Sequence, residues 1–174
     1  MAHSVLVVPV AEMEPFVRAR HEHYDRAYVS SDPTFAHAHV TALGPFVPLQ
    51  RITDSVLGRV GEVVESASSF SFRLERVATF PGGIVHLVPE PAGPFRSLGA
   101  ALGRAFPAYP SYAGEFANVA PHLTLDALGA GVDEASVRSA VSGLVPSAAR
   151  EVRLSWYEPW ACRTLATWAL GVSR

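Results

Sequence analysis

Two short motifs, each a histidine followed two residues later by a threonine, stand in the two halves of the chain. The first is His39 and Thr41 within HAHVTALGPF, and the second is His122 and Thr124 within VAPHLTLDALG. On a β-strand each histidine and its threonine would point to the same face, because side chains alternate along a strand. A face of that kind carries polar, titratable groups where a buried strand would carry apolar ones.

Two imidazoles and two hydroxyls around one target make a general acid–base site. The unperturbed pKa of histidine is about 6.5, so one ring can take a proton near neutral pH while the other gives one. The threonine hydroxyls can donate hydrogen bonds to the oxygens of an anion held between the rings. In-line displacement at phosphorus needs a base and an acid on opposite sides of the phosphorus and donors for its growing charge. This chemistry requires no metal ion.

The elements that must position these residues follow from hydrophobic periodicity and turn residues. Strands are predicted over residues 4–10, 37–43, 70–77, 84–88, 119–125, 152–156 and 165–171. Helices are predicted over residues 13–28, 52–64 and 95–106, and a fourth begins after Asp133 and carries Val137, Ala140, Val141, Leu144 and Val145. The order is β-α-β-α-β-β-α-β-α-β-β, with two clear hairpins. It predicts an α+β fold with a mainly antiparallel sheet.

The two motifs also occupy similar places in the chain. They are separated by close to half of its length, and each predicted motif strand follows one helix and precedes another. This pattern indicates two similar lobes related by an approximate two-fold axis. Such an axis would bring the two histidines and two threonines together at one central cleft.

HVTALGPF (39–46) and PHLTLDAL (121–128) resemble the two signatures of the two-histidine (2H) phosphoesterase superfamily, which includes 2′-5′ RNA ligase-like proteins and cyclic phosphodiesterases. The resemblance implies one domain over residues 1–174, in which two antiparallel sheets flank a cleft and helices lie outside. It implies His39 and His122 as the catalytic acid–base pair, and Thr41 and Thr124 as phosphate ligands. It implies a metal-independent phosphodiesterase without a cofactor, acting on a 2′,3′-cyclic phosphate or a 2′-5′ linkage.

Asp126 and His37 leave alternatives open. Asp126 stands two residues after Thr124. If its side chain lies on the site face, it would repel a polyanion, and it could orient a histidine or bind a sugar hydroxyl. If it does not, it caps the turn before Gly129. His37 and His39 have the spacing of two zinc ligands on a strand, and His122 would complete a three-histidine site. The simpler interpretation leaves His37 at the rim of the pocket.

Several other residues have both a structural and a functional interpretation. His21 and His23 are expected on the helix surface, and His86 either lines the cleft or is a hydrogen-bonded structural histidine. The aromatic residues of the loop 107–118 either stack on a base or cover the core. Arg163 is a candidate phosphate contact. The aromatic residues of the last hairpin are expected to pack it, and they are Trp156, Tyr157, Trp160 and Trp168.

Composition limits the partners. The formal net charge is -2 and no basic run exists, which argues against duplex DNA as a partner. No apolar run is long enough to span a bilayer. The single cysteine, Cys162, excludes an intramolecular disulfide and favours a cytoplasmic location. We therefore expect a monomer that acts on a nucleotide, an RNA terminus or another small phosphoester.

Three competing functions remain at this point. The protein could bind a phosphorylated ligand without turning it over, or it could use its histidines for non-phosphate acid–base chemistry in a biosynthetic pathway. A metal-dependent hydrolase is the third. A fold by itself does not decide among them.

Overall fold

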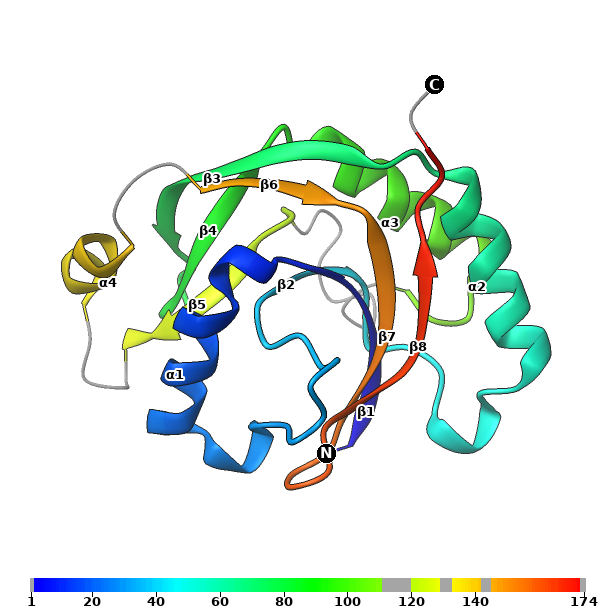
Figure 1. Ribbon diagram of the computed structural model, residues 1–174, viewed down its shortest axis with the longest axis horizontal. Helices are drawn as coiled ribbons and strands as arrows, with labels where there is room; N and C mark the ends of the chain where they lie inside the picture. The colour runs from blue at the N-terminus through cyan, green and yellow to red at the C-terminus, as the bar shows by residue number, and fades with distance from the viewer. Residues whose placement is uncertain (1, 111–119, 129–132, 142–144, 173–174) are drawn as a thin grey trace.

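The computed structural model describes residues 2–110, 120–128, 133–141 and 145–172. Within these residues the chain forms eight strands and four α-helices, so the α+β class and the antiparallel sheet are confirmed (Figure 1). The strands are β1 (His3–Pro9), β2 (His39–Leu43), β3 (Phe70–Thr79), β4 (Ile84–Glu90), β5 (Leu123–Ala127), β6 (Val145–Ala149), β7 (Glu151–Tyr157) and β8 (Arg163–Ala169). The helices are α1 (Glu14–Tyr24), α2 (Asp54–Ser66), α3 (Gly93–Ala105) and α4 (Glu134–Ala140).

All eight strands belong to one curled antiparallel sheet with the order β6-β3-β4-β5-β2-β1-β7-β8. The two halves of this sheet meet at its centre, where β5 and β2 share one aligned pair, Val40 with Leu123. The expected lobes are therefore hydrogen-bonded into a continuous sheet rather than built as two separate ones. The two motif strands are the two that meet at this junction.

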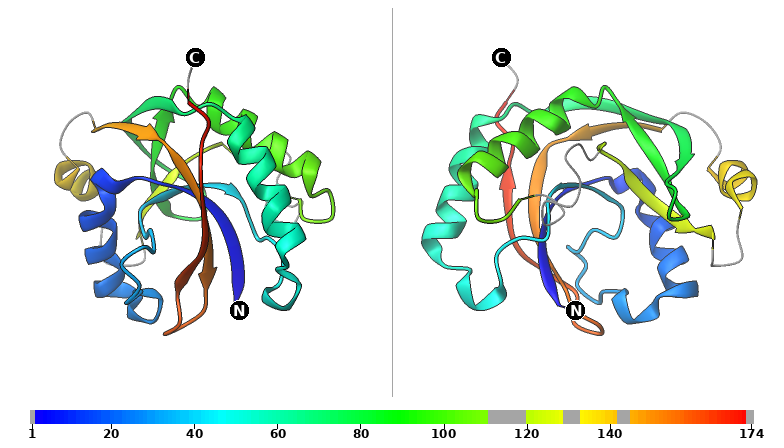
Figure 2. Two further views of the ribbon diagram at one scale, coloured as in Figure 1. Left: turned by 45° about the vertical axis from the view of Figure 1, so that its right-hand side comes forward. Right: turned by 180° about the vertical axis from the view of Figure 1, so that it is seen from behind.

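The helices lie at the periphery of the sheet, with α1 and α4 on one side and α2 and α3 on the other (Figures 1 and 2). Helix α1 packs against β5, and α3 packs against β2. Apolar residues of the two central strands, Val40 and Leu123 among them, join the same buried core as Leu98 and Leu102 of α3. Because side chains alternate along a strand, His39 and Thr41 take the opposite face.

Local sequence explains where the helices begin. Pro15 stands in the first turn of α1, where its missing N–H costs nothing. The Thr53 hydroxyl caps α2 by accepting from the Val56 amide. Asp133 caps α4 as predicted, and its carboxylate accepts from the Ser136 amide at 2.7 Å.

Two predicted helices were too long. Helix α1 ends at Tyr24, and a separate 3-10 turn follows over Arg26–Tyr28. The fourth helix ends at Ala140, Leu144 lies outside the described residues, and Val145 opens strand β6, which the sequence reading did not anticipate. Pro146 cannot continue a helix, but it is tolerated in β6 because β6 is an edge strand.

Candidate active site

The junction of β2 and β5 brings the two motifs together. Val40 is aligned with Leu123, so the antiparallel register continued by one residue on each side puts His39 opposite Thr124, and Thr41 opposite His122. His122 immediately precedes β5, and with the register extended in this way all four side chains would project from the same face of the sheet. Diagonal neighbours on such a pair of strands are about 7–8 Å apart. That spacing leaves room for one phosphoryl group between the two imidazoles.

Both motif histidines are held by the same kind of hydrogen bond. Nδ1 of His39 lies 3.0 Å from the Ala36 carbonyl oxygen, and Nδ1 of His122 lies 2.9 Å from the Ala120 carbonyl oxygen. A carbonyl only accepts, so in each ring Nδ1 carries the proton and Nε2 keeps a lone pair. Each histidine thus presents Nε2 for proton transfer.

The surroundings of these two rings favour the neutral form. Burial lowers the pKa of His39 to about 4, although hydrogen bonds to the backbone of Ala36 and His37 act in the opposite direction. Burial likewise lowers the pKa of His122, against the effect of its bond to the Ala120 carbonyl. Both rings are therefore neutral at pH 7 in the absence of a ligand. A bound phosphate anion would favour protonation of one of them.

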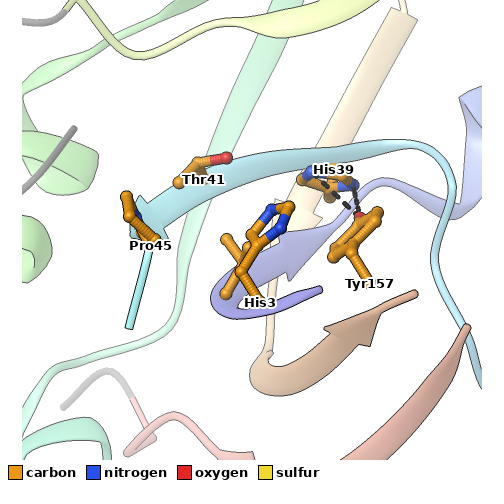
Figure 3. Close-up of a pocket in the computed structure, with 7 residues that line it drawn as sticks. His3, His39, Thr41, Pro45 and Tyr157 are labelled. Carbon is orange, nitrogen blue, oxygen red and sulfur yellow. Dashed lines mark hydrogen bonds between the residues drawn. The ribbon is translucent and has the colours of Figure 1, made fainter. Parts of the chain in front are cut away.

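A pocket of about 450 Å³ opens beside the first motif (Figure 3). Its lining residues are His3, Val5, His39, Thr41, Gly44, Pro45 and Tyr157. The Tyr157 hydroxyl lies 3.4 Å from Nδ1 and 3.5 Å from Nε2 of His39, and burial raises the pKa of this phenol. The His3 ring stacks on the Tyr157 ring with their centroids 5.5 Å apart.

His3 and Tyr157 line the pocket, and the sequence did not single them out as candidates for it. The sequence favours hairpin packing over a ligand platform for Tyr157, and it gives no information on His3. They lie in the same pocket as His39 because β1 pairs with β2 on one side and with β7 on the other. Strand pairing between residues so far apart in the chain leaves no periodic trace in the sequence.

The second motif also has aromatic neighbours. His86 of β4 is aligned with Thr124 of β5, so it faces the site, as one of the two interpretations held. Its ring stacks on Phe80 with centroids 3.9 Å apart and meets His122 edge-on at 5.4 Å. Its Nδ1 also lies 3.3 Å from the Ile84 carbonyl oxygen, which the structural interpretation expected. The two interpretations are therefore compatible.

His37 does not belong to the pocket, and its placement on the strand was wrong. Strand β2 begins only at His39, and His37 is buried before it. Nδ1 of His37 lies 2.5 Å from a Glu14 carboxylate oxygen, and its Nε2 accepts from the Ser30 amide at 3.1 Å. Both nitrogens are occupied, so the three-histidine zinc site with His122 is not formed. Within the described ranges, no group of three or more His, Cys, Asp and Glu side chains is arranged as a metal site.

Asp126 lies away from the site face, so the interpretation in which it repels a polyanion there is wrong. A register shift between Val85 and His86 places Asp126 opposite Val85, whose side chain belongs to the core. Asp126 is 1% exposed and forms an ion pair with Arg20 of helix α1. Its other carboxylate oxygen accepts from the Ala127 amide at 2.8 Å. This aspartate is a buried structural residue.

The remaining candidates have other surroundings. Arg163 donates to the Ala161 carbonyl at 3.1 Å and does not line the pocket. In the aromatic loop, Tyr109 packs edge-on against Phe46 in the core, whereas residues 111–119, with Tyr112 and Phe116, lie outside the described residues. His23 is exposed as predicted, and His21 is partly covered by His37. None of the four described helices is long and apolar enough to cross a membrane.

Solved structures with the same fold were found although sequence identity is low. Escherichia coli LigT in complex with NADP+ is 17% identical, with a TM-score of 0.56 over 97% of both chains. Its complex with 3′-AMP is 16% identical, with a TM-score of 0.55 over 98% of both chains. The Thermus thermophilus protein TT0787 is 19% identical, with a TM-score of 0.63 over the whole of both chains. These likenesses establish the fold.

Sequence comparison establishes the family. No curated protein matched the sequence. Residues 8–158, which include both histidine–threonine motifs and the strands between and around them, match the 2′-5′ RNA ligase superfamily. The resemblance inferred from the two motifs is thereby confirmed, and the chain belongs to the 2′-5′ RNA ligase superfamily of 2H phosphoesterase-like proteins.

Proposed function

We propose that the protein is a metal-independent phosphodiesterase that acts on a nucleotide or RNA-end phosphodiester, either a 2′,3′-cyclic phosphate or a 2′-5′ linkage. The observation that supports this proposal is the pairing of β2 with β5 at Val40 and Leu123, because the register extended from this pair brings His39, Thr41, His122 and Thr124 to one face. We take the chain to act as one domain over residues 1–174, with one motif from each half. We further propose a cytoplasmic monomer, a location that fits the buried free thiol of Cys162.

In the proposed reaction, Nε2 of one histidine removes a proton from the attacking water. The water oxygen forms a bond to phosphorus, and the bond from phosphorus to the opposite oxygen breaks. The second histidine, protonated when the anion binds, gives its Nε2 proton to that leaving oxygen. Thr41 and Thr124 donate hydrogen bonds to the non-bridging oxygens, which carry more negative charge in the transition state.

The pocket beside His39 supports a substrate with a sizeable organic part. Its volume of about 450 Å³ is within the range of small-molecule sites, and its walls are mainly apolar and aromatic. We place the nucleoside in this pocket and the phosphoryl group between the histidines. Escherichia coli LigT was crystallised with 3′-AMP, with ATP and with phosphate, which fits a nucleotide as the substrate.

A panel of substrates tests the proposed function. The purified protein is incubated with the four 2′,3′-cyclic mononucleotides and a 2′-5′-linked dinucleotide, with and without EDTA, and products are followed by chromatography. We expect turnover of at least one class, at a rate that the chelator leaves unchanged. Binding of these compounds without turnover would support the non-catalytic alternative instead. Turnover that EDTA abolishes and Zn²⁺ restores would support a metal-dependent hydrolase.

The acid–base pair predicts a distinctive pH profile. The active form of the enzyme has one histidine neutral and the other protonated. Because burial lowers the pKa of both His39 and His122, this form is most populated at a pH below the usual histidine range. As pH rises, kcat/KM should rise through the lower pKa, near 4, and fall through the higher one, below about 6.5. Measurement from pH 3.5 to 9 would contradict the prediction if kcat/KM were largest above pH 7.

A further inference from the structure

Glu14 connects the start of helix α1 to the segment that precedes the first motif. One carboxylate oxygen lies 2.5 Å from Nδ1 of His37, and the other accepts from the Ala38 amide at 2.8 Å. Burial alone would raise the pKa of Glu14, but the bonds from His37 and Ala38 outweigh it and hold the pKa below its usual value. An ionised carboxylate with two donors forms strong, geometrically specific bonds.

His37 links Glu14 to a second segment of the chain through its other ring nitrogen. Its Nε2 accepts from the Ser30 amide, so its proton must sit on Nδ1, where it is donated to Glu14. The Ser30 hydroxyl in turn donates to the Cys162 carbonyl at 2.5 Å. His37 is only 1% exposed in its side chain, so water cannot replace these partners at low cost. The segment 36–38 is therefore fixed from two sides.

The segment held in this way determines the state of His39. The carbonyl of Ala36, the residue just before His37, accepts the Nδ1 proton of His39. This bond selects the tautomer that leaves Nε2 free for proton transfer. A shift of the segment would weaken the bond and allow the other tautomer, in which Nε2 carries the proton and cannot act as a base.

We infer that Glu14 is a positioning residue for His39, acting through His37 and the backbone of residues 36–38. The inference rests on the proposed function for its kinetic consequence, because His39 is there one member of the acid–base pair. It gives a purpose to the first histidine of HAHVTALGPF, which neither binds a metal with His39 nor touches the pocket. It also adds to the reaction a residue that lies far from both motifs in the chain.

The test replaces Glu14 with glutamine and uses Glu22→Gln as the matched control. Glutamine keeps the shape of the side chain. When its oxygen accepts from the Ala38 amide, however, its NH₂ group faces the Nδ1 proton of His37, so two donors oppose each other and that hydrogen bond is lost. Glu22 is on the same helix and forms an exposed ion pair with Arg18, so its replacement makes the same chemical change away from the segment. Long-range ¹H–¹⁵N correlation spectra report the tautomer of His39, and steady-state kinetics give kcat and KM at each variant's own pH optimum.

We expect His39 of the wild type and of Glu22→Gln to carry its proton on Nδ1, and that of Glu14→Gln to show a mixture of tautomers. For Glu14→Gln, kcat should fall about 10–100-fold with KM within about twofold, because misplacement of a reacting group acts mainly on the chemical step. An unchanged tautomer in Glu14→Gln would overturn the inference, whatever the activity. So would a fall in activity confined to KM.

Two further arms keep the test decisive. The spectra require no turnover, so a protein without phosphodiesterase activity would refute the proposed function while the positioning of His39 by Glu14 is still measured. If Glu14→Gln does not fold, Glu14→Asp keeps the charge and shortens the reach by one methylene. We expect it to show an intermediate mixture of tautomers, and a wild-type tautomer in that variant would overturn the inference.

Discussion

Alanine at His39 or at His122 is expected to lower kcat/KM for the preferred substrate by about 10²–10⁴-fold. Each replacement removes the imidazole that is proposed to take or give the proton on its side of the phosphoryl position. The double variant should lose little more than either single variant, because an acid and a base that act together in one step are not additive. Initial rates over a range of substrate concentrations measure the effect.

The control for this experiment is His23→Ala, which removes an exposed histidine of helix α1 and should leave kcat/KM unchanged. Far-ultraviolet circular dichroism and thermal unfolding establish that each variant is folded. Activity within about threefold of the wild type in a folded His39→Ala or His122→Ala protein would refute the acid–base pair. In that case the scaffold would serve a different chemistry.

The motif strands and most of the fold were predictable because their signals are local. A β-branched run predicted β1, the turn signal at residues 81–83 predicted β4 as the returning strand of a hairpin, and Asp133 caps the fourth helix as expected. The histidine–threonine spacing was enough to predict one shared face, because alternation along a strand needs no knowledge of its partners. What the local signals could not give was the order of the strands in the sheet.

The surroundings of the motifs depended on that order and on one irregularity. Tyr157 reaches His39 because β7 lies near β2 in the sheet, with only β1 between them. Alternation predicts His37 on the strand, but its bond to Glu14 holds it in the buried segment before the strand. Simple alternation allows Asp126 on the site face, as one of its two interpretations held, but the register shift between Val85 and His86 turns it toward Arg20 of helix α1. Alternation fails wherever a strand starts late or contains a bulge.

Methionine at Arg20 is expected to lower the free energy of unfolding by about 3 kcal/mol. The carboxylate of Asp126 is buried and Arg20 is its charged partner, so removal of the guanidinium leaves an uncompensated negative charge inside the protein. Breaking a buried ion pair from one side typically costs about 3–5 kcal/mol, and we take the lower limit because Arg20 is 22% exposed. Urea unfolding at pH 7 measures the change.

The matched comparison is Arg18→Met on the same helix, whose exposed ion pair with Glu22 should contribute no more than about 0.5 kcal/mol. Arg20→Met combined with Asp126→Asn removes both charges and should recover most of the lost stability, since a neutral pair leaves no charge buried alone. Because Asp126 faces the core, this double variant should also keep wild-type kcat/KM when it is folded. If Asp126→Asn alone abolished turnover in a folded protein, Asp126 would have to act on the substrate or on a histidine after all, and its burial against helix α1 would not describe the working enzyme.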